Sequence, residues 1–167
     1  GLPPHTAGVR LLELAYRVIA PKGWEARITR ADWPAVAAMP WVMMPEHSNS
    51  QQMLVEAFEQ RGLDLPQKLI EADQASVITD LVASGVGLSL VREEIALAGR
   101  DEGRWVLWEP ARLKTALWFI YPANRSQDAL IQALLKVLGE VWDLDAAPVP
   151  SARPAGSSQQ QASHSQA

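Results

Sequence analysis

Cysteine is absent from the 167 residues, and histidine occurs only three times. Without thiols the chain can form neither a disulfide framework nor a thiolate zinc site, and it has no cysteine nucleophile. His5, His47 and His164 are too scattered in the sequence for a metal site built on histidine. We therefore expect no metal and no other cofactor.

Long apolar runs are also missing, because no run of about 18 apolar residues is present for a membrane span. Residues 1–5 (GLPPH) lack the charged and apolar parts of a signal peptide. These first residues look like an arbitrary starting point within a protein, so we expect the chain to be a piece of a longer one. The 15 basic residues are outnumbered by 19 acidic ones, and the net charge of −4 does not favour direct binding to DNA.

Familiar catalytic signatures are not found either. The sequence holds no P-loop pattern, no H-E-x-x-H pair and no G-x-S-x-G elbow. The pair Gly85 and Gly87 follows a predicted helix and opens a predicted strand, which indicates a helix end and a tight turn rather than a dinucleotide fingerprint. We assign no catalytic residue and do not expect an enzyme.

What the chain does have is a 48% apolar content and an alternation of strand and helix patterns over residues 11–145. Such alternation predicts an α/β fold, Rossmann-like, with a mixed or mainly parallel sheet flanked by helices. The expected strands are residues 14–20, 41–44, 67–71, 86–91, 105–108 and 115–121. The expected helices are residues 31–39, 50–61, 75–84, 92–98 and 125–142, with Ser48 or Asn49, Asp73 and Ser126 as caps.

The composition changes at residue 146. Of the 22 residues 146–167, 19 are Ala, Pro, Ser, Gly or Gln. Such a segment buries too little apolar area to offset about 1–2 kcal/mol of backbone entropy per residue. We therefore expect one α/β domain over residues 1–145 and a disordered tail over residues 146–167.

Two loops carry more polar groups than helix capping needs. One follows the strand at 41–44 and the other follows the strand at 67–71, and each leads into a predicted helix. Ligands of open α/β sheets bind beyond the carboxyl ends of strands, and helix N-termini favour anions. Two ordinary helix caps are the alternative. The candidate ligand contacts are His47, Ser48, Asn49, Ser50, Gln74 and Ser76.

The chain resembles the effector-binding domain of LysR-type transcriptional regulators. Residues 81–91 (LVASGVGLSLV) are similar to that family's LV-A-x-G-x-G-x-x-L-x-P stretch, although Arg92 replaces the final Pro. Residues 41–63 resemble the family's strand, polar loop and helix. Residues 14–21 resemble the strand that leads into the family's second subdomain. Residues 118–142 resemble its closing strand and last helix. Lys22-Gly23-Trp24 stands where the family commonly has HPL.

This resemblance implies a fold of the type II periplasmic-binding-protein kind. It further implies a second subdomain with the closing strand and helix of the first, truncated at the N-terminus. In the family a small molecule, often an organic or aromatic acid, sits in the cleft between two subdomains. The contacting loops match Ser48–Ser50 and Gln74–Ser76. The resemblance also implies a cytoplasmic homodimer or homotetramer that reaches DNA only through a winged helix-turn-helix missing here.

Three alternatives stay open. A solute-binding protein of a transport system shares the two-lobed fold, and a signal peptide upstream would favour it. A small α/β enzyme is weaker, because no nucleophile and base pair is seen. A degenerate piece without a function of its own is the third.

Overall fold

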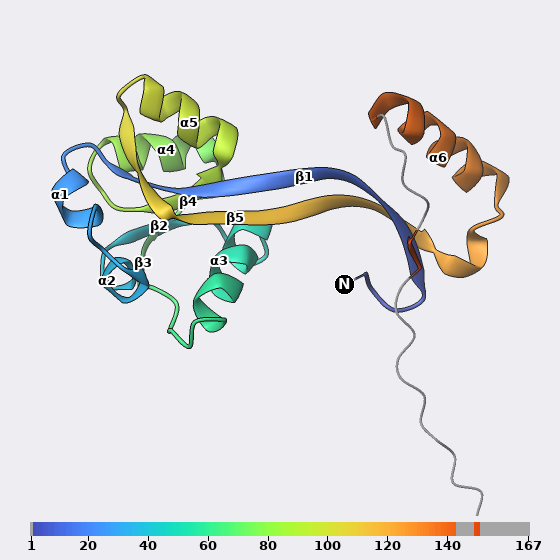
Figure 1. Ribbon diagram of the computed structural model, residues 1–167, viewed down its shortest axis with the longest axis horizontal. Helices are drawn as coiled ribbons and strands as arrows, with labels where there is room; N and C mark the ends of the chain where they lie inside the picture. Colours follow the sequence, from blue (N-terminus) through green and yellow to red (C-terminus); the bar gives the residue numbers. More distant parts are fainter. Residues whose placement is uncertain (1, 143–148, 151–167) are drawn as a thin grey trace, which may run out of the picture. The chain divides into compact units, whose positions relative to one another are not determined.

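The computed structural model describes residues 2–142 and 149–150 (Figure 1). The chain divides into two compact units, one of residues 1–12 and 116–167 and one of residues 13–115. In chain order the elements are β1 (Thr6–Pro21), α1 (Glu25–Ile28), α2 (Trp33–Ala37), β2 (Trp41–Met43), α3 (Asn49–Glu59), β3 (Lys68–Glu71), α4 (Ala75–Ala83), β4 (Ser89–Arg92), α5 (Glu93–Asp101), β5 (Trp105–Pro122), η1 (Ala123–Arg125), α6 (Ala129–Trp142) and β6 (Val149–Pro150).

Two small sheets organise the unit of residues 13–115. In the first, β1 lies between β4 and β5, and β1 pairs antiparallel with β4 from Tyr16 opposite Arg92 to Ile19 opposite Ser89. In the second, β2 and β3 are parallel. Trp41 of β2 also bridges Leu88 in the parallel sense. The predicted α/β class is confirmed, and the fold contains both antiparallel and parallel strand pairs.

The unit has a helical layer on each side of its strands, with α4 and α5 on one side and α2 and α3 on the other (Figure 1). The side chains of β1 alternate between its two faces, which explains how this strand packs against both helical layers. Val18 and Ala20 belong to the cluster under α2 and α3, whereas Ile19 belongs to the cluster under α4 and α5. Successive side chains of a strand point to opposite faces, so both faces of β1 are apolar here.

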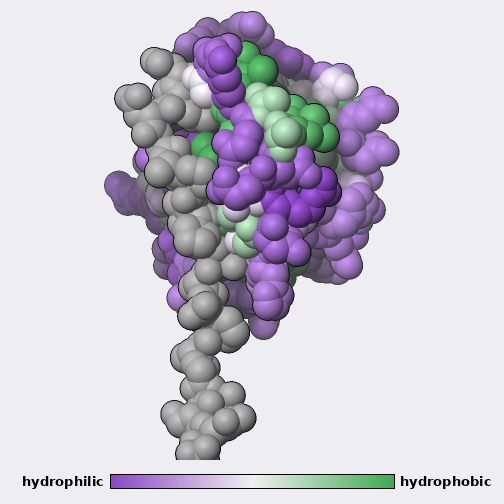
Figure 2. Space-filling model, turned by 90° about the vertical axis from the view of Figure 1, so that its right-hand side faces the viewer, coloured by the Kyte–Doolittle hydropathy of each residue, from purple (hydrophilic) through white to green (hydrophobic). Residues whose placement is uncertain are grey.

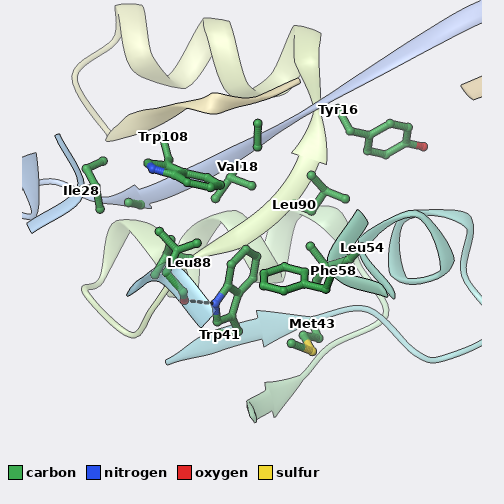
Figure 3. Close-up of a cluster of buried hydrophobic side chains, with 13 residues drawn as sticks. Tyr16, Val18, Ile28, Trp41, Met43, Leu54, Phe58, Leu88, Leu90 and Trp108 are labelled. Atoms are coloured by element: carbon green, nitrogen blue, oxygen red, sulfur yellow. Dashed lines mark hydrogen bonds between the residues drawn. The ribbon is translucent and has the colours of Figure 1, made fainter. Parts of the chain in front are cut away.

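Aromatic side chains fill the cluster under α2 and α3 (Figure 3). The indole of Trp33 meets Phe58 edge-on at 5.2 Å and Trp108 at 4.9 Å between ring centroids. Trp41 is fully buried and donates its indole N–H to the carbonyl oxygen of Val36 at 2.8 Å. Burial of a large apolar side chain stabilises the fold by about 1.5–3 kcal/mol, and the polar atom of Trp41 is satisfied.

The other unit is built from the first part of β1, the last part of β5, η1, α6 and β6. Its small core holds Ala7, Tyr121 and Ile131. Ile131 is the only buried residue of α6, and Leu130 and Val141 are 65% and 70% exposed. Figure 2 shows hydrophobic side chains that lie open between hydrophilic ones.

Some expected boundaries were wrong. The two strands expected at 105–108 and 115–121 are one strand, β5, and β1 begins at Thr6 instead of residue 14. The helix α1 was not expected. The last helix begins at Ala129, because the Oδ1 atom of Asp128 accepts the N–H of Leu130 at 2.9 Å.

Two expected caps are also corrected. Ser126 ends η1 and does not begin α6, and Gln74, not Asp73, holds the N-cap position of α4. The cap at Ser48 is confirmed. Most of the tail expected at residues 146–167 lies outside the described residues. Within it, Val149 and Pro150 pair with β1 opposite Gly8 and Ala7. No helix in the described part of the chain is long and apolar enough to cross a membrane.

Candidate functional site

The first candidate loop joins β2 to α3. Ser48 is the N-cap of α3, and its Oγ atom accepts the backbone N–H of Gln51 at 3.2 Å. The Oγ atoms of Ser48 and Ser50 lie 3.5 Å apart. Ser50 is buried at 8% exposure, whereas His47 and Asn49 are exposed. This loop therefore offers a hydroxyl pair, an open amide and an open imidazole around one helix start.

A residue that the sequence did not single out supports this loop. Gln51 is only 5% exposed, and its side-chain Nε2 donates to the Sδ atom of Met43 at 3.5 Å. The spacing Ser48-x-x-Gln51 matches a capping box, which is the signal that could have drawn attention to Gln51. In the structure the Gln51 amide turns to the end of β2 instead, and so it ties the first turn of α3 to that strand.

The second candidate loop joins β3 to α4. Gln74 occupies the N-cap position without a side-chain hydrogen bond, and both Gln74 and Ser76 are exposed. The Oγ1 atom of Thr79 donates to the carbonyl oxygen of Ser76 at 2.9 Å. The first N–H groups of α4 thus have no capping side chain at Gln74, which leaves them open to solvent or to a ligand.

The register of β2 and β3 brings the two loops to one edge. Met43 lies opposite Glu71, and the N–H of Ala72 donates to the carbonyl oxygen of Met43 at 3.0 Å. Because the strands are parallel, their carboxyl ends point the same way, so both loops leave the sheet from the same side. All six predicted residues lie in these two loops or in the first turns of the helices that follow.

The glycine pair is structural, as predicted. Gly85 has φ of 91° just after α4, which suits a helix end. A Cβ atom on Gly87 would lie 2.4 Å from the carbonyl oxygen of Pro40. Gly87 therefore allows the close approach in which the N–H of Leu88 donates to that same oxygen at 2.9 Å.

A network of ion pairs lies away from the two loops. Arg112 of β5 donates to both carboxylate oxygens of Glu93, at 2.6 and 2.8 Å, and Arg17 of β1 contacts Glu93 and Glu109. The hydrogen bonds from Arg112, with the charge of Arg17 added, lower the pKa of Glu93 to about 2. The network joins the start of α5 to two strands. Among the described residues, no group of three His, Asp or Glu side chains could hold a metal ion.

A pocket of 220 Å³ opens beside α3, and none of the six predicted residues lines it. Its walls come from α3, from the two residues that follow this helix, and from β5. The lining residues are Met53, Glu56, Ala57, Gln60, Arg61, Arg112, Leu113 and Lys114.

Comparison with known proteins gives one family and many similar folds. The model of the family described as LysR substrate binding domain matches residues 2–143. The regulatory domain of CcmR from Synechocystis PCC6803, solved with 2-PG, is 16% identical with a TM-score of 0.63, over 87% of this chain and 73% of that one.

Two other solved structures have a TM-score of 0.61. The regulatory domain of HypT from Salmonella typhimurium is 9% identical over 84% of this chain and 67% of that one. ArgP from Mycobacterium tuberculosis is 19% identical over 85% of this chain and 48% of that one. At these identities the likeness shows the fold. No curated protein matches the sequence.

Proposed function

Because this chain belongs to the LysR substrate-binding domain family, we propose that its two strand-end loops hold a small effector acid. The chain is an effector-sensing domain of a LysR-type transcriptional regulator. The family is one of regulator domains and not of enzymes, so the alternatives of a solute-binding protein and a small enzyme are not favoured. We extend this to the chain itself, which we expect to lack catalytic activity.

One observation carries the site proposal. The hydrogen bond from the N–H of Ala72 to the carbonyl of Met43 sets the parallel register that brings two helix N-termini to one sheet edge. Ser48 and Ser50 add hydroxyl groups at the first helix, and Gln74 and Ser76 stand exposed at the second. A ligand at this edge would meet both loops at once.

The chemistry of the edge favours an acid. Each helix start carries a partial positive charge and N–H groups that point outward, and both suit a carboxylate. Hydroxyl and amide groups give direction to hydrogen bonds without adding negative charge. An organic or aromatic carboxylate therefore fits better than an amine.

The mechanism follows from a shift of population. An effector that binds one arrangement of the regulator more tightly than another raises the share of that arrangement. We propose that the unit of residues 13–115 is the family's second subdomain and that the other unit contributes closing elements of the first. The signal would then pass through a homodimer or homotetramer in the cytoplasm to a winged helix-turn-helix, and the chain would touch DNA only through that domain.

A thermal-shift titration tests the site. Benzoate and citrate are the acid probes, and benzamide is the uncharged match to benzoate. We expect an acid to raise the melting temperature with concentration, as binding to the native state requires, and benzamide to have no such effect. Asn49→Ala and Ser50→Ala should weaken this shift, whereas Asn124→Ala, an exposed residue of η1, should keep it. An acid whose shift survives both loop variants binds elsewhere and contradicts the proposed site.

A further inference from the structure

The pocket between α3 and β5 contains two opposite charges that do not pair with each other. Glu56 and Arg61 both line it, and no residue of the two loops proposed for the effector lies in its wall. Within the described residues, neither side chain forms an ion pair with another residue. The pocket is thus a separate feature that the proposed function does not use.

Arg61 is held in place on one side of this pocket. Its Nη1 donates to the carbonyl oxygen of Ala57 at 2.6 Å, and its guanidinium lies 3.9 Å from the centre of the Trp33 ring. Stacking and a backbone hydrogen bond together fix the plane of the guanidinium. A fixed guanidinium loses little freedom when it binds a carboxylate, which makes it a prepared anion contact.

Glu56 is held by a different partner. Its Oε1 accepts a hydrogen bond from the side-chain Nε2 of Gln60, the C-cap residue of α3, at 3.0 Å. The carboxylate and the guanidinium therefore each have a partner of their own near the C-terminal end of α3, and no ion pair joins the two. The pocket presents one cation and one anion at the same time.

The other two cations of the wall bring their own counter-charges. Arg112 is bound by both oxygens of Glu93, and Lys114 lies 2.8 Å from Glu13. A ligand with only a negative charge would be repelled by the carboxylate of Glu56. A ligand with only a positive charge would be repelled by the guanidinium of Arg61. A ligand with both charges satisfies both residues.

We propose that this pocket binds a free α-amino acid with an aliphatic side chain, its carboxylate at Arg61 and its ammonium at Glu56. Met53, Ala57 and Leu113 give the wall its apolar part, which suits an aliphatic group. The volume of 220 Å³ lies below the range of about 300–1,000 Å³ that is usual for drug-sized ligands, so a small metabolite fits. Several wall side chains are exposed, so the site is a shallow one.

Isothermal titration calorimetry of the whole chain tests this with three probes of similar shape. Leucine carries both charges, 4-methylpentanoate carries only the carboxylate, and 3-methylbutylamine carries only the ammonium. We expect saturable binding of leucine and binding at least tenfold weaker for the other two. Glu56→Gln should weaken leucine binding about as much as removing the ammonium does, and Arg61→Gln about as much as removing the carboxylate.

Controls separate this pocket from the effector loops. Glu59→Gln changes an exposed carboxylate of the same helix outside the pocket and should leave leucine binding unchanged. Asn49→Ala should also leave it unchanged, and a loss there would place leucine at the loops and overturn the pocket. Equal binding of 4-methylpentanoate and leucine, or no saturable leucine binding, would also overturn the proposal. Arg61→Lys keeps the charge if Arg61→Gln fails to fold, and it should retain more leucine binding than Glu56→Gln does.

Discussion

Arg112 donates to both carboxylate oxygens of Glu93, at 2.6 and 2.8 Å, and so joins β5 to the first residue of α5. Two parallel hydrogen bonds fix the direction of both groups. Since Arg17 of β1 contacts the same carboxylate, one side chain holds three elements together.

Glu93→Gln should make the protein less stable near neutral pH and should matter less in acid. The pKa of Glu93 is about 2 in the folded chain against an ordinary value of 4.5. A lowered pKa contributes stability that is present above 4.5 and is lost as the pH falls toward 2. Urea unfolding of parent and variant across this range should show their midpoints converging. The change Glu94→Gln removes only an exposed ion pair with Arg92 and should cost less near neutral pH.

Gly99→Ala should destabilise the chain strongly. A Cβ atom there would lie 1.8 Å from the ring of Trp105, whose indole N–H donates to the carbonyl of Ala96. Overpacking of this kind costs about 1–3 kcal/mol or more. A Cβ atom on Gly139 of α6 would meet no neighbouring atom within 4 Å. Gly139→Ala should therefore raise the free energy of unfolding by about 0.4–1 kcal/mol. Equal unfolding free energies for the two variants would contradict the packing described at α5.

Ser48→Ala should cost about 0.5–2 kcal/mol, because the Oγ atom of Ser48 caps α3 through the N–H of Gln51. Thermal unfolding measures this cost. A second measurement, the benzoate titration, shows whether the same hydroxyl also serves the ligand. The matched change Ser84→Ala removes a hydroxyl at the C-cap of α4, the opposite end of that helix from its N-terminus. It should leave the benzoate titration unaltered.

Gln74→Asp separates capping from ligand binding. Gln74 stands at the N-cap of α4 without a side-chain hydrogen bond, so an aspartate there should add about 1 kcal/mol to the free energy of unfolding. The same carboxylate would repel an acid at this loop. We therefore expect a higher melting temperature together with a weaker response to benzoate. If the response is unchanged, the second loop takes no part in acid binding.

The elements that could be predicted from the sequence are those whose sequence pattern lies within the element itself. The helix expected at residues 50–61 is α3, in which Leu54, Ala57 and Phe58 are buried, and Gly62, with φ of 66°, follows its end. The single strand β5 was missed because Pro110 and the polar residues around it look like a break. In the sheet order β4-β1-β5 this strand lies at an edge, and edge strands are where sheets accept proline.

For the candidate site too, the sequence predicts the local features but not the contacts between distant segments. The sequence places each polar loop after a strand, but it does not say that β2 and β3 are neighbours in parallel. That fact rests on contacts such as Ala72 with Met43, which are distant in the chain. The contact between Gln51 and Met43 was likewise beyond a pattern search, because a glutamine at that spacing usually turns back to the cap.

The double-sided packing of β1 makes this strand far more sensitive to changes of length than to changes of residue. Replacing Val18 by isoleucine alters one cluster by a methylene, and the rest of the strand keeps its place. Inserting one residue before Ile19 would exchange the sides of every later position and send Ile19 and Ala20 into the wrong layers. In a library of insertions we expect residues 16–20 to admit none, whereas the turn at Gly103, with its φ of 70°, should admit several.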